Sequence, residues 1–337
     1  MAEINRREFV MGALGAAGIV LLSRLPAFGK TIDDRAVKSV SLRVTCRTEF
    51  LMSVKKEKVC IWMPVPQNDM WQSVTGFEFS SALKHKYYGD ETSAFKLLYL
   101  ESTGVKKGLS LTMKYNLKRR ACSAAADSGR TPKDFLKPSE WEKINDKVAA
   151  FTGHLAGGQN DPVKAARIFY DAVIDRINYV HEACTRGVSV MAFEDKAGRS
   201  DDYNALFRTM MIHRGIPTVW EQGIALPLPS ETKNEGKVEA DCINAHSWVS
   251  FFAADNKWYP VDLTLGKTRP ELRDYCFGNL PPNRIKISVG REITLTPPQK
   301  EILNTFAYTY VESNGIPLIY GHHYRNVINY ELVGMEI

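Results

Sequence analysis

One strongly amphipathic segment constrains the fold of this chain more than any other feature. Its apolar side chains follow the i, i+3, i+4, i+7, i+8 spacing of a helix with one buried face: Tyr203, Leu206, Phe207, Met210 and Met211. Ser200 is a suitable N-cap, Asp201 and Asp202 suit the positive end of a helix dipole, and Gly215 is a suitable C-terminal stop. We therefore predict a helix that starts at Ser200, ends near Gly215 and buries its apolar stripe.

Two strands follow this helix. Residues 245–252 and 257–264 both have a strand-like pattern, and Ala254-Asp255-Asn256 supplies a turn between them. A hairpin would bring His246 close to Asp262 if both side chains face the same side. By itself, a His on a strand is usually a packed or surface residue and an Asp at a strand end is usually a turn residue, so the pairing needs further support.

The first part of the chain is predicted to be β-structure. Residues 40–47 and 109–118 alternate apolar and polar side chains, which is typical of an antiparallel sheet with one buried face. Residues 59–66 form a buried strand that prolines stop. We assign residues 30–120 to an N-terminal β-domain. Its 17 basic and 9 acidic residues indicate either an ordinary solvated sheet face or a surface for an anionic envelope partner.

The remaining chain divides into three parts. Residues 121–138 are rich in Ala, Ser, Gly and Pro and are expected to form a linker. The core is expected over residues 139–266, where Ser139 and Glu142 fit a capping box that opens a helix toward Leu155. Asp161-Pro162 should start the next helix, which continues to about Asn178. Residues 267–337 are expected to add strands and loops that brace the core.

The N-terminus has the pattern of an export signal. Arg6-Arg7 precede a thirteen-residue uncharged run, and this run is too short for a membrane span, which needs about 20 apolar residues. Paired arginines before a mild Gly/Ala-rich segment resemble a twin-arginine signal, so residues 1–29 are predicted to be such a signal peptide. A short amphipathic anchor is the alternative, and the signal could be cleaved after Gly29 or retained. The protein is expected in the periplasm or outside the cell, with no stable membrane span after signal removal.

Composition and motifs exclude several classes of function. A net charge of +6 is too small to indicate a nucleic-acid binder. Neither C-x-x-C nor H-E-x-x-H occurs, and phosphate-binding glycine motifs are also missing, so we predict no metal and no cofactor. The six cysteines allow fifteen complete disulfide pairings, and the sequence does not choose among them.

Three linked motifs in residues 160–266 resemble those of the transglutaminase-like family, relatives of the papain-type cysteine proteases. They are the helix start at Gly198–Tyr203 with a Gly-Ile-Pro end, His246-x-Trp248, and Trp258-x-x-Val261-Asp262-x-Thr264. The resemblance implies an α+β fold, with a papain-like core whose helix packs on an antiparallel sheet, preceded by an antiparallel β-module. It also implies that a Cys at the helix start attacks an amide carbonyl, that a His transfers the proton and that an Asp orients the His. These roles fall on Ser200, His246 and Asp262.

Ser200 departs from the family pattern, because the nucleophile there is a cysteine. A helix terminus can stabilise a thiolate, but a serine hydroxyl needs a general base during attack. Three interpretations follow. The protein binds a peptide- or cell-wall-like amide, or serves as a structural envelope protein, with little or no turnover. Alternatively, Ser200, His246 and Asp262 form an active amide hydrolase or acyl transferase. Lastly, another cysteine such as Cys184 or Cys242 replaces the nucleophile, or a Cys-to-Ser change was introduced to trap a substrate. For both cysteines, a buried thiol or a disulfide is the simpler interpretation.

Overall fold

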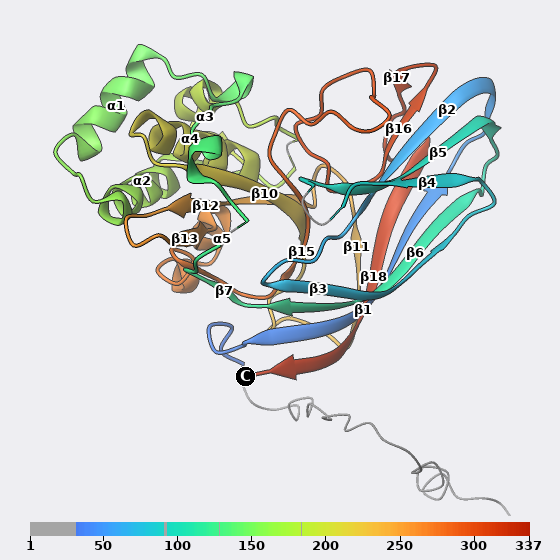
Figure 1. The fold of residues 1–337 in the computed structure, drawn as a ribbon, viewed down its shortest axis with the longest axis horizontal. Coiled ribbons are helices and arrows are strands. Elements are labelled where there is room, and N and C mark those ends of the chain that lie inside the picture. Colours follow the sequence, from blue (N-terminus) through green and yellow to red (C-terminus); the bar gives the residue numbers. More distant parts are fainter. Residues whose placement is uncertain (1–31, 91–92, 128, 183) are drawn as a thin grey trace, which may run out of the picture.

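The computed structural model describes residues 32–90, 93–127, 129–182 and 184–337, and the expected signal at residues 1–29 lies outside these ranges. Figure 1 shows helices gathered on one side of the molecule and long strands on the other. Within the described ranges, no helix has both the length and the apolar character needed to cross a membrane. The fold is α+β, as predicted.

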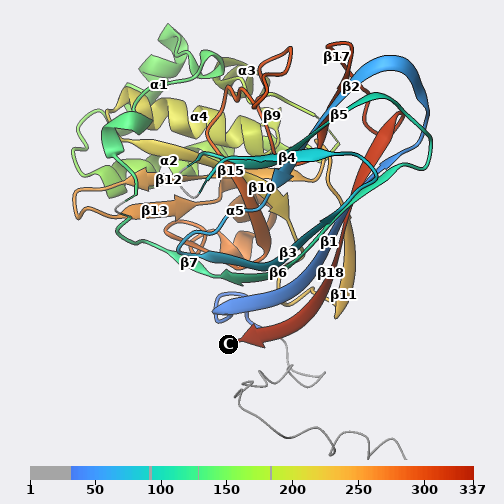
Figure 2. The same cartoon turned by 45° about the vertical axis from the view of Figure 1, so that its right-hand side comes forward.

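The long strands form two five-stranded sheets that pack face to face (Figures 1 and 2). The first sheet has the order β11 (Glu235–Glu239), β18 (Tyr324–Glu336), β1 (Ser39–Phe50), β6 (Ser110–Arg120) and β3 (Gln72–Ser80). The second has the order β17 (Ile316–Pro317), β16 (Tyr310–Ser313), β2 (Val54–Val65), β5 (Lys96–Val105) and β4 (His85–Tyr88). All strand pairs in both sheets are antiparallel.

The predicted alternation explains how this sandwich is held together. Val40, Leu42 and Val44 of β1 are buried, and so are Leu111 and Met113 of β6, with their other faces more exposed. Burial of such side chains contributes about 1.5–3 kcal/mol each. The period-two pattern in the sequence therefore predicted the core-facing side of both strands correctly.

The helical part is built on a four-stranded antiparallel sheet with the order β13 (Trp258–Val261), β12 (Ala245–Phe252), β10 (Thr218–Ala225) and β15 (Arg284–Val289). The helices around it are α1 (Asp146–Ala156), α2 (Pro162–Arg176), α3 (Ser189–Asp195), α4 (Ser200–His213) and α5 (Leu263–Thr268). Three short 3-10 helices are η1 (Pro132–Phe135), η2 (Glu140–Glu142) and η3 (Pro270–Leu272). Two small strand pairs join β7 (Cys122–Ser123) to β14 (Asn279–Leu280) and β8 (Asn178–Tyr179) to β9 (Ala197–Gly198).

Helix α4 packs against β12, which places its N-terminus at the start of that strand. The predicted apolar stripe is fully buried, at Tyr203, Leu206, Phe207, Met210 and Met211. Val249 and Phe251 of β12 belong to the same hydrophobic cluster. The central prediction from the sequence, a helix buried on an antiparallel sheet, is confirmed.

Two expectations differ from the structure. The capping box at Ser139 opens only the short η2, because the buried Glu142 carboxylate is held by Arg208 and Arg291 and the chain becomes extended at Lys143. The next helix, α1, starts only at Asp146.

Residues 267–337 also differ from expectation, because only part of them braces the core. Strand β15 joins the core sheet, whereas β16, β17 and β18 belong to the sandwich. The alternating buried residues of β18, such as Ile328 and Tyr330, contribute to the sandwich core. The C-terminus therefore lies beside the start of β1.

Candidate active site

The N-terminus of α4 positions Ser200. Arg199, and not Ser200, is the N-cap, because the Asp202 carboxylate accepts a hydrogen bond from the Arg199 backbone N–H at 2.8 Å. Burial raises the pKa of this carboxyl above its usual value. Ser200 becomes the first helical residue, and its side chain is free of the capping role that the sequence predicted for it. It is 5% exposed.

The hairpin of β12 and β13 positions the other two residues. Val249 pairs with Val261, and the chain turns between Ala253 and Lys257. Asp262 follows β13 directly and is the N-cap of α5, where it accepts a hydrogen bond from the Leu265 N–H at 2.9 Å. The predicted strand–turn–strand arrangement thus brings His246 to Asp262, with 2.7 Å between His246 Nε2 and Asp262 Oδ2.

Asp262 is fully buried between two basic side chains. The same oxygen that contacts His246 lies 2.9 Å from an Arg284 guanidinium nitrogen. Burial alone would raise the pKa of Asp262, but the charges of His246 and Arg284 and the hydrogen bonds outweigh it and hold this pKa below its usual value. Asp262 is therefore a carboxylate that fixes the orientation of the His246 ring.

The sequence analysis assigned no role to Arg284. A signal was present in the alternation Arg284-Ile285-Lys286-Ile287, in which two basic residues share one side of an apolar strand. All four are buried in β15. Buried charges need partners, so this strand could have indicated acidic residues nearby. Arg284 pairs with Asp262, and Lys286 pairs with both Asp69 and Glu221.

Ser200 lies next to His246 through the backbone of β12. The Ser247 N–H donates to Ser200 Oγ at 3.3 Å. From standard backbone dimensions, this contact places Ser200 Oγ within about 6 Å of the His246 Cα. In the part of the chain that the structure describes, no hydrogen bond joins the two side chains directly. The structure thus brings together all three residues that the sequence singled out.

Ser200 and His246 border different cavities. One cavity of about 290 Å³ is lined by Ser200, Arg199, Asp201 and segment 301–305. Another of about 280 Å³ is lined by His246, Asp262 and Arg284, among others. The two residues are therefore reached from solvent through different cavities.

Polar contacts hold the wall of the Ser200 cavity. Asp201 accepts hydrogen bonds from Ser247 Oγ at 2.6 Å and from Asn304 Nδ2 at 3.0 Å. Asn304 lies in a loop that connects the core sheet to the sandwich. The first turn of α4 is thereby fixed both to β12 and to a segment about 100 residues later in the chain.

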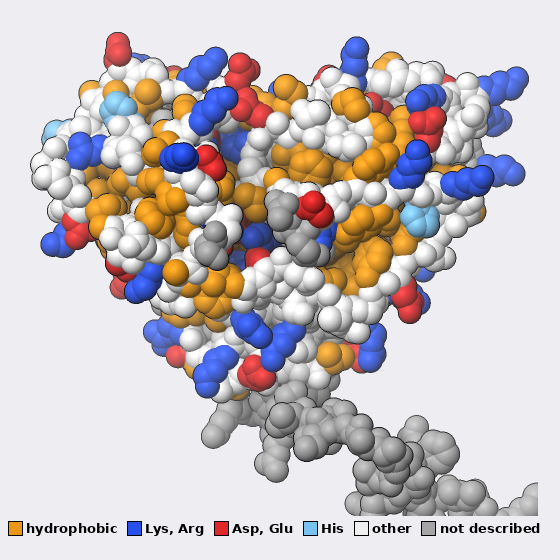
Figure 3. Space-filling model, viewed as in Figure 1, with side chains coloured by type: hydrophobic (Ala, Val, Ile, Leu, Met, Phe, Trp, Pro, Cys, Tyr) orange, Lys and Arg blue, Asp and Glu red, His pale blue; other side chains and the backbone are white. Residues whose placement is uncertain are grey.

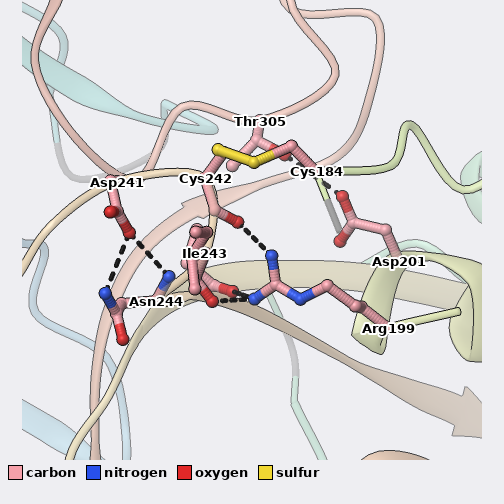
Figure 4. Close-up of a disulfide and its surroundings, with 9 residues drawn as sticks. Cys184, Arg199, Asp201, Asp241, Cys242, Ile243, Asn244 and Thr305 are labelled. Carbon is pink, nitrogen blue, oxygen red and sulfur yellow. Dashed lines mark hydrogen bonds between the residues drawn. A yellow bond between two sulfur atoms is a disulfide. The ribbon is translucent and has the colours of Figure 1, made fainter. Parts of the chain in front are cut away.

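Cys184 and Cys242, which both line this cavity, form a disulfide, and Figure 4 shows its surroundings. Beside it, the Arg199 guanidinium donates hydrogen bonds to the carbonyl oxygens of Cys242 and Ile243. These contacts tie the loop before β12 to the residue before Ser200. Of the pairings that the sequence left open, the disulfide is the one observed here. Neither cysteine therefore offers a thiol that could replace the nucleophile.

The two buried free cysteines, Cys276 and Cys122, are also unsuited to that role. Cys276 contacts the site, since its carbonyl accepts from the Asp262 N–H at 3.1 Å, but it is fully buried. Burial and the neighbouring Asp262 charge raise the pKa of its thiol. Burial also raises the pKa of Cys122. A reactive cysteine is usually partly exposed with a lowered pKa, so neither thiol resembles a displaced nucleophile.

Trp248 packs against both His246 and Arg284. Its ring centre lies 5.9 Å from that of His246, and the Arg284 guanidinium lies 4.8 Å from it. Its indole N–H donates to Glu221 at 2.9 Å. Trp248 is thus a buried aromatic that packs between the His246–Asp262 pair and the buried charges of the sheet.

The comparisons with known proteins agree with this architecture. Residues 149–263 match the family described as the transglutaminase-like superfamily, and this segment holds Ser200, His246 and Asp262. This segment is therefore similar to transglutaminase-like domains. No relative is found among curated proteins.

Among solved structures, a candidate cysteine protease from Cytophaga hutchinsonii has 12% identity and a TM-score of 0.52, covering 88% of this chain and 98% of that one. The periplasmic domain of TgpA from Pseudomonas aeruginosa has 14% identity and a TM-score of 0.36, covering 71% of this chain and 94% of that one. The first likeness shows that the fold is shared, including the papain-like core that the sequence predicted.

Proposed function

We propose that this chain is an exported transglutaminase-like protein that binds a peptide- or cell-wall-like amide at Ser200 and turns it over weakly or not at all. The single observation behind this proposal is the contact of Ser200 Oγ. That oxygen accepts a hydrogen bond from the Ser247 N–H, while His246 Nε2 is engaged by Asp262. A pair of base and orienting acid is present, but the hydroxyl is not hydrogen-bonded to the base.

The chemistry of serine argues for low activity. In a Cys site, the helix dipole and a neighbouring imidazole stabilise a thiolate before the substrate arrives. A hydroxyl is too weak an acid for this, and it must lose its proton to a base within about 2.6–3.2 Å during attack. No hydrogen bond joins the Ser200 and His246 side chains among the described residues, so one of these side chains would need to move before the imidazole could take this proton.

Asp262 has a structural role that does not depend on turnover. It caps α5 and neutralises the buried Arg284. Loss of one member of a buried ion pair costs about 3–5 kcal/mol. Asp262 would therefore also be needed by a protein that only binds its ligand.

The cavity at Ser200 fits a binding role better than a purely structural one. It is not filled by side chains and has a volume of about 290 Å³. Its walls offer both donors and acceptors, including Asn304, Thr305 and Asp201. An amide group presents one donor and one acceptor, so such a wall can recognise it from both sides.

Export is supported by two features of the chain. The twin-arginine pattern precedes residue 29, and Cys184 and Cys242 form a disulfide. Disulfides persist mainly in oxidising compartments such as the periplasm. A location in the periplasm or outside the cell fits both features.

An active serine hydrolase is the second candidate. It is favoured by the closeness of Ser200 to His246 and by the oriented His246–Asp262 pair. Ser-His-Asp sets catalyse acyl transfer on several unrelated folds. Cleavage of peptide amides by the wild-type protein, abolished in Ser200→Ala, would establish this candidate in place of the binding protein.

Binding is tested by titrating the full chain with short N-acetylated peptide amides and soluble cell-wall peptides. We expect binding without release of cleaved product. Thr305→Trp should abolish it, because Thr305 lines the Ser200 cavity and the larger ring would fill it. Val333→Trp, an exposed position on β18, is the matched control. Absence of binding to every probe would leave the structural envelope role in place of the proposal.

A further inference from the structure

Another cavity lies away from Ser200. It has a volume of about 690 Å³ and is bordered by the sandwich, by residues from segments 122–127 and 129–135 and by the core sheet. It shares no described lining residue with the cavities at Ser200 and His246. On the face drawn in Figure 3, Lys and Arg side chains lie in the recess between the two halves of the molecule.

Buried charges line this cavity and are largely paired with one another. Lys286 contacts both Asp69 and Glu221 at 2.8 Å. Arg130 contacts Glu221 at 2.7 Å and Asp127 at 3.1 Å. Burial alone would raise the pKa of Glu221, but the Lys286 and Arg130 charges hold it below its usual value.

Among the basic residues that line this cavity, Arg119 has the most distant carboxylate partner. It is 1% exposed, and its nearest carboxylate oxygen, on Asp69, is 3.9 Å away, too far for a hydrogen bond. Its Nη2 donates a hydrogen bond to Cys122 Sγ at 3.0 Å. Its Nε and Nη1 are buried and lack an acceptor among the described residues.

Two other residues that line this cavity also have a buried N–H group without an acceptor among the described residues. Trp258 Nε1 and Gln67 Nε2 are buried atoms that also lack an acceptor in the described part of the chain. Native proteins rarely leave such groups unpaired, because a buried donor without an acceptor loses the hydrogen bonds that it makes with water in the unfolded chain. All three residues present donors, so the cavity lacks acceptors and not donors.

We propose that this cavity binds a peptide-like ligand through its free carboxylate. The two oxygens of a carboxylate can accept hydrogen bonds from the unpaired donors, and its negative charge can neutralise the charge of Arg119. Trp71, Phe135 and Trp258 provide aromatic surface for an apolar side chain next to it. The volume lies within the usual range of about 300–1,000 Å³ for small-ligand sites.

The experiment uses the full chain and a set of N-acetyl dipeptides that carry free C-terminal carboxylates. Ligand-observed NMR identifies the tightest binder, and calorimetry gives its Kd and the Kd of the same peptide as a C-terminal amide. We expect the amide to bind at least about tenfold more weakly, because hydrogen bonds to a charged group contribute about 1.5–3 kcal/mol.

Two Trp substitutions then locate the site. Trp258→Phe keeps an aromatic ring and removes the N–H, and should weaken binding about 3- to 10-fold. Trp220→Phe is the matched control, because Trp220 Nε1 is also buried without an acceptor among the described residues, but Trp220 is not one of the residues that line this cavity. It should leave the Kd unchanged, and so should Thr305→Trp at the Ser200 cavity. Both Phe variants are compared with wild type by thermal unfolding to ensure that they are folded.

The proposal would be overturned if no dipeptide binds and the cavity holds only water. It would also be overturned if the peptide acid and its C-terminal amide have the same Kd, or if Trp258→Phe and Trp220→Phe change the Kd equally. Binding that is lost in Thr305→Trp and kept in Trp258→Phe would also overturn it, since the peptide would then occupy the Ser200 cavity. That result would leave the proposed function standing, so the two proposals can fail separately.

Discussion

Ser200 Oγ lies 3.3 Å from the backbone nitrogen of Ser247, the residue that follows His246. This contact joins the first turn of α4 to the start of β12 and holds the side chain of residue 200 beside the His246–Asp262 pair. A sulfur in the same position would face the same positive helix end and the same imidazole.

We therefore expect Ser200→Cys to create a reactive thiol. Its apparent pKa should fall below the value of about 8.5 for a free cysteine, because the helix dipole and His246 both favour the thiolate. The pH dependence of its alkylation rate measures this pKa, with the native free cysteines replaced or blocked.

The control is Ser200→Cys combined with His246→Ala. The combination should return the thiol pKa toward about 8.5, with only the dipole effect remaining. A single variant that already titrates near about 8.5 would show that His246 does not act on residue 200. Restored cleavage of peptide amides in the single variant would show that only the nucleophile is missing.

The sequence predicted those parts of the fold that depend on local patterns. Alternation identified β1 and β6, and apolar spacing identified the buried face of α4. The three candidate residues fall within sequence motifs at the start of α4, on β12 and directly after β13, and the fold brings these positions together.

Long-range pairings could not be predicted in this way. Strand β18 pairs with β1 across almost the whole chain, and nothing local to either strand specifies that partner. The pairing of Cys184 with Cys242 is also long-range, since the chain has six cysteines and no local pattern pairs these two. The same is true of Arg284, because its partner Asp262 lies between β13 and α5. Such contacts depend on the assembled fold, which periodicity does not describe.

Asp262→Asn should destabilise the protein strongly at neutral pH. The change leaves the buried Arg284 without its carboxylate partner and weakens the hydrogen bond to His246. We expect a loss of about 3–5 kcal/mol in the free energy of unfolding. Urea unfolding of both proteins measures it, and Asp255→Asn at an exposed turn serves as a control with little expected change.

The effect of Asp262 should also depend on pH. In the folded protein, the pKa of the Asp262 carboxyl is below its usual value. The ionised carboxylate therefore stabilises the fold at any pH above its unfolded-state pKa of about 3.9. This stabilisation is lost as the pH falls toward the pKa in the folded protein. The difference between wild type and Asp262→Asn should therefore narrow below about pH 4. A constant difference over that range would contradict the assigned pKa direction.

Gly223→Ala should disrupt the sheet behind the site. Gly223 pairs with His246 and with Lys286, and a Cβ at this position would lie 1.9 Å from the Ile285 carbonyl oxygen. Backbone must move to relieve this clash, so we expect a loss of more than about 3 kcal/mol. In contrast, Gly153→Ala in α1 meets no atom within 4 Å and should stabilise the helix by about 0.5–1 kcal/mol. Thermal unfolding of the two variants distinguishes these opposite signs, and equal effects would contradict the assigned sheet register.

The Cys184–Cys242 disulfide should contribute to stability through the segment that it closes. The two cysteines are separated by 58 residues, and a loop of this length gives about 4 kcal/mol in the chain-entropy estimate. Reductant should therefore lower the Tm of the wild-type protein. The double variant Cys184→Ser, Cys242→Ser should have the lower Tm without reductant and show no further response to it. A wild-type Tm that does not change on complete reduction would exclude a stabilising role for the disulfide.

The last prediction connects this disulfide to the route of export. Twin-arginine signals depend on their paired arginines, so Arg6→Lys combined with Arg7→Lys should leave the precursor in the cytoplasm. Cysteines are kept reduced there, and the retained protein should contain Cys184 and Cys242 as thiols. Cell fractionation measures export, and thiol labelling under denaturing conditions measures the redox state of the two cysteines. The exported wild-type protein should show no labelling at these positions. Unimpaired export of the Lys variant would reject the twin-arginine assignment. A fully formed disulfide in the retained protein would show that this bond does not depend on the oxidising compartment.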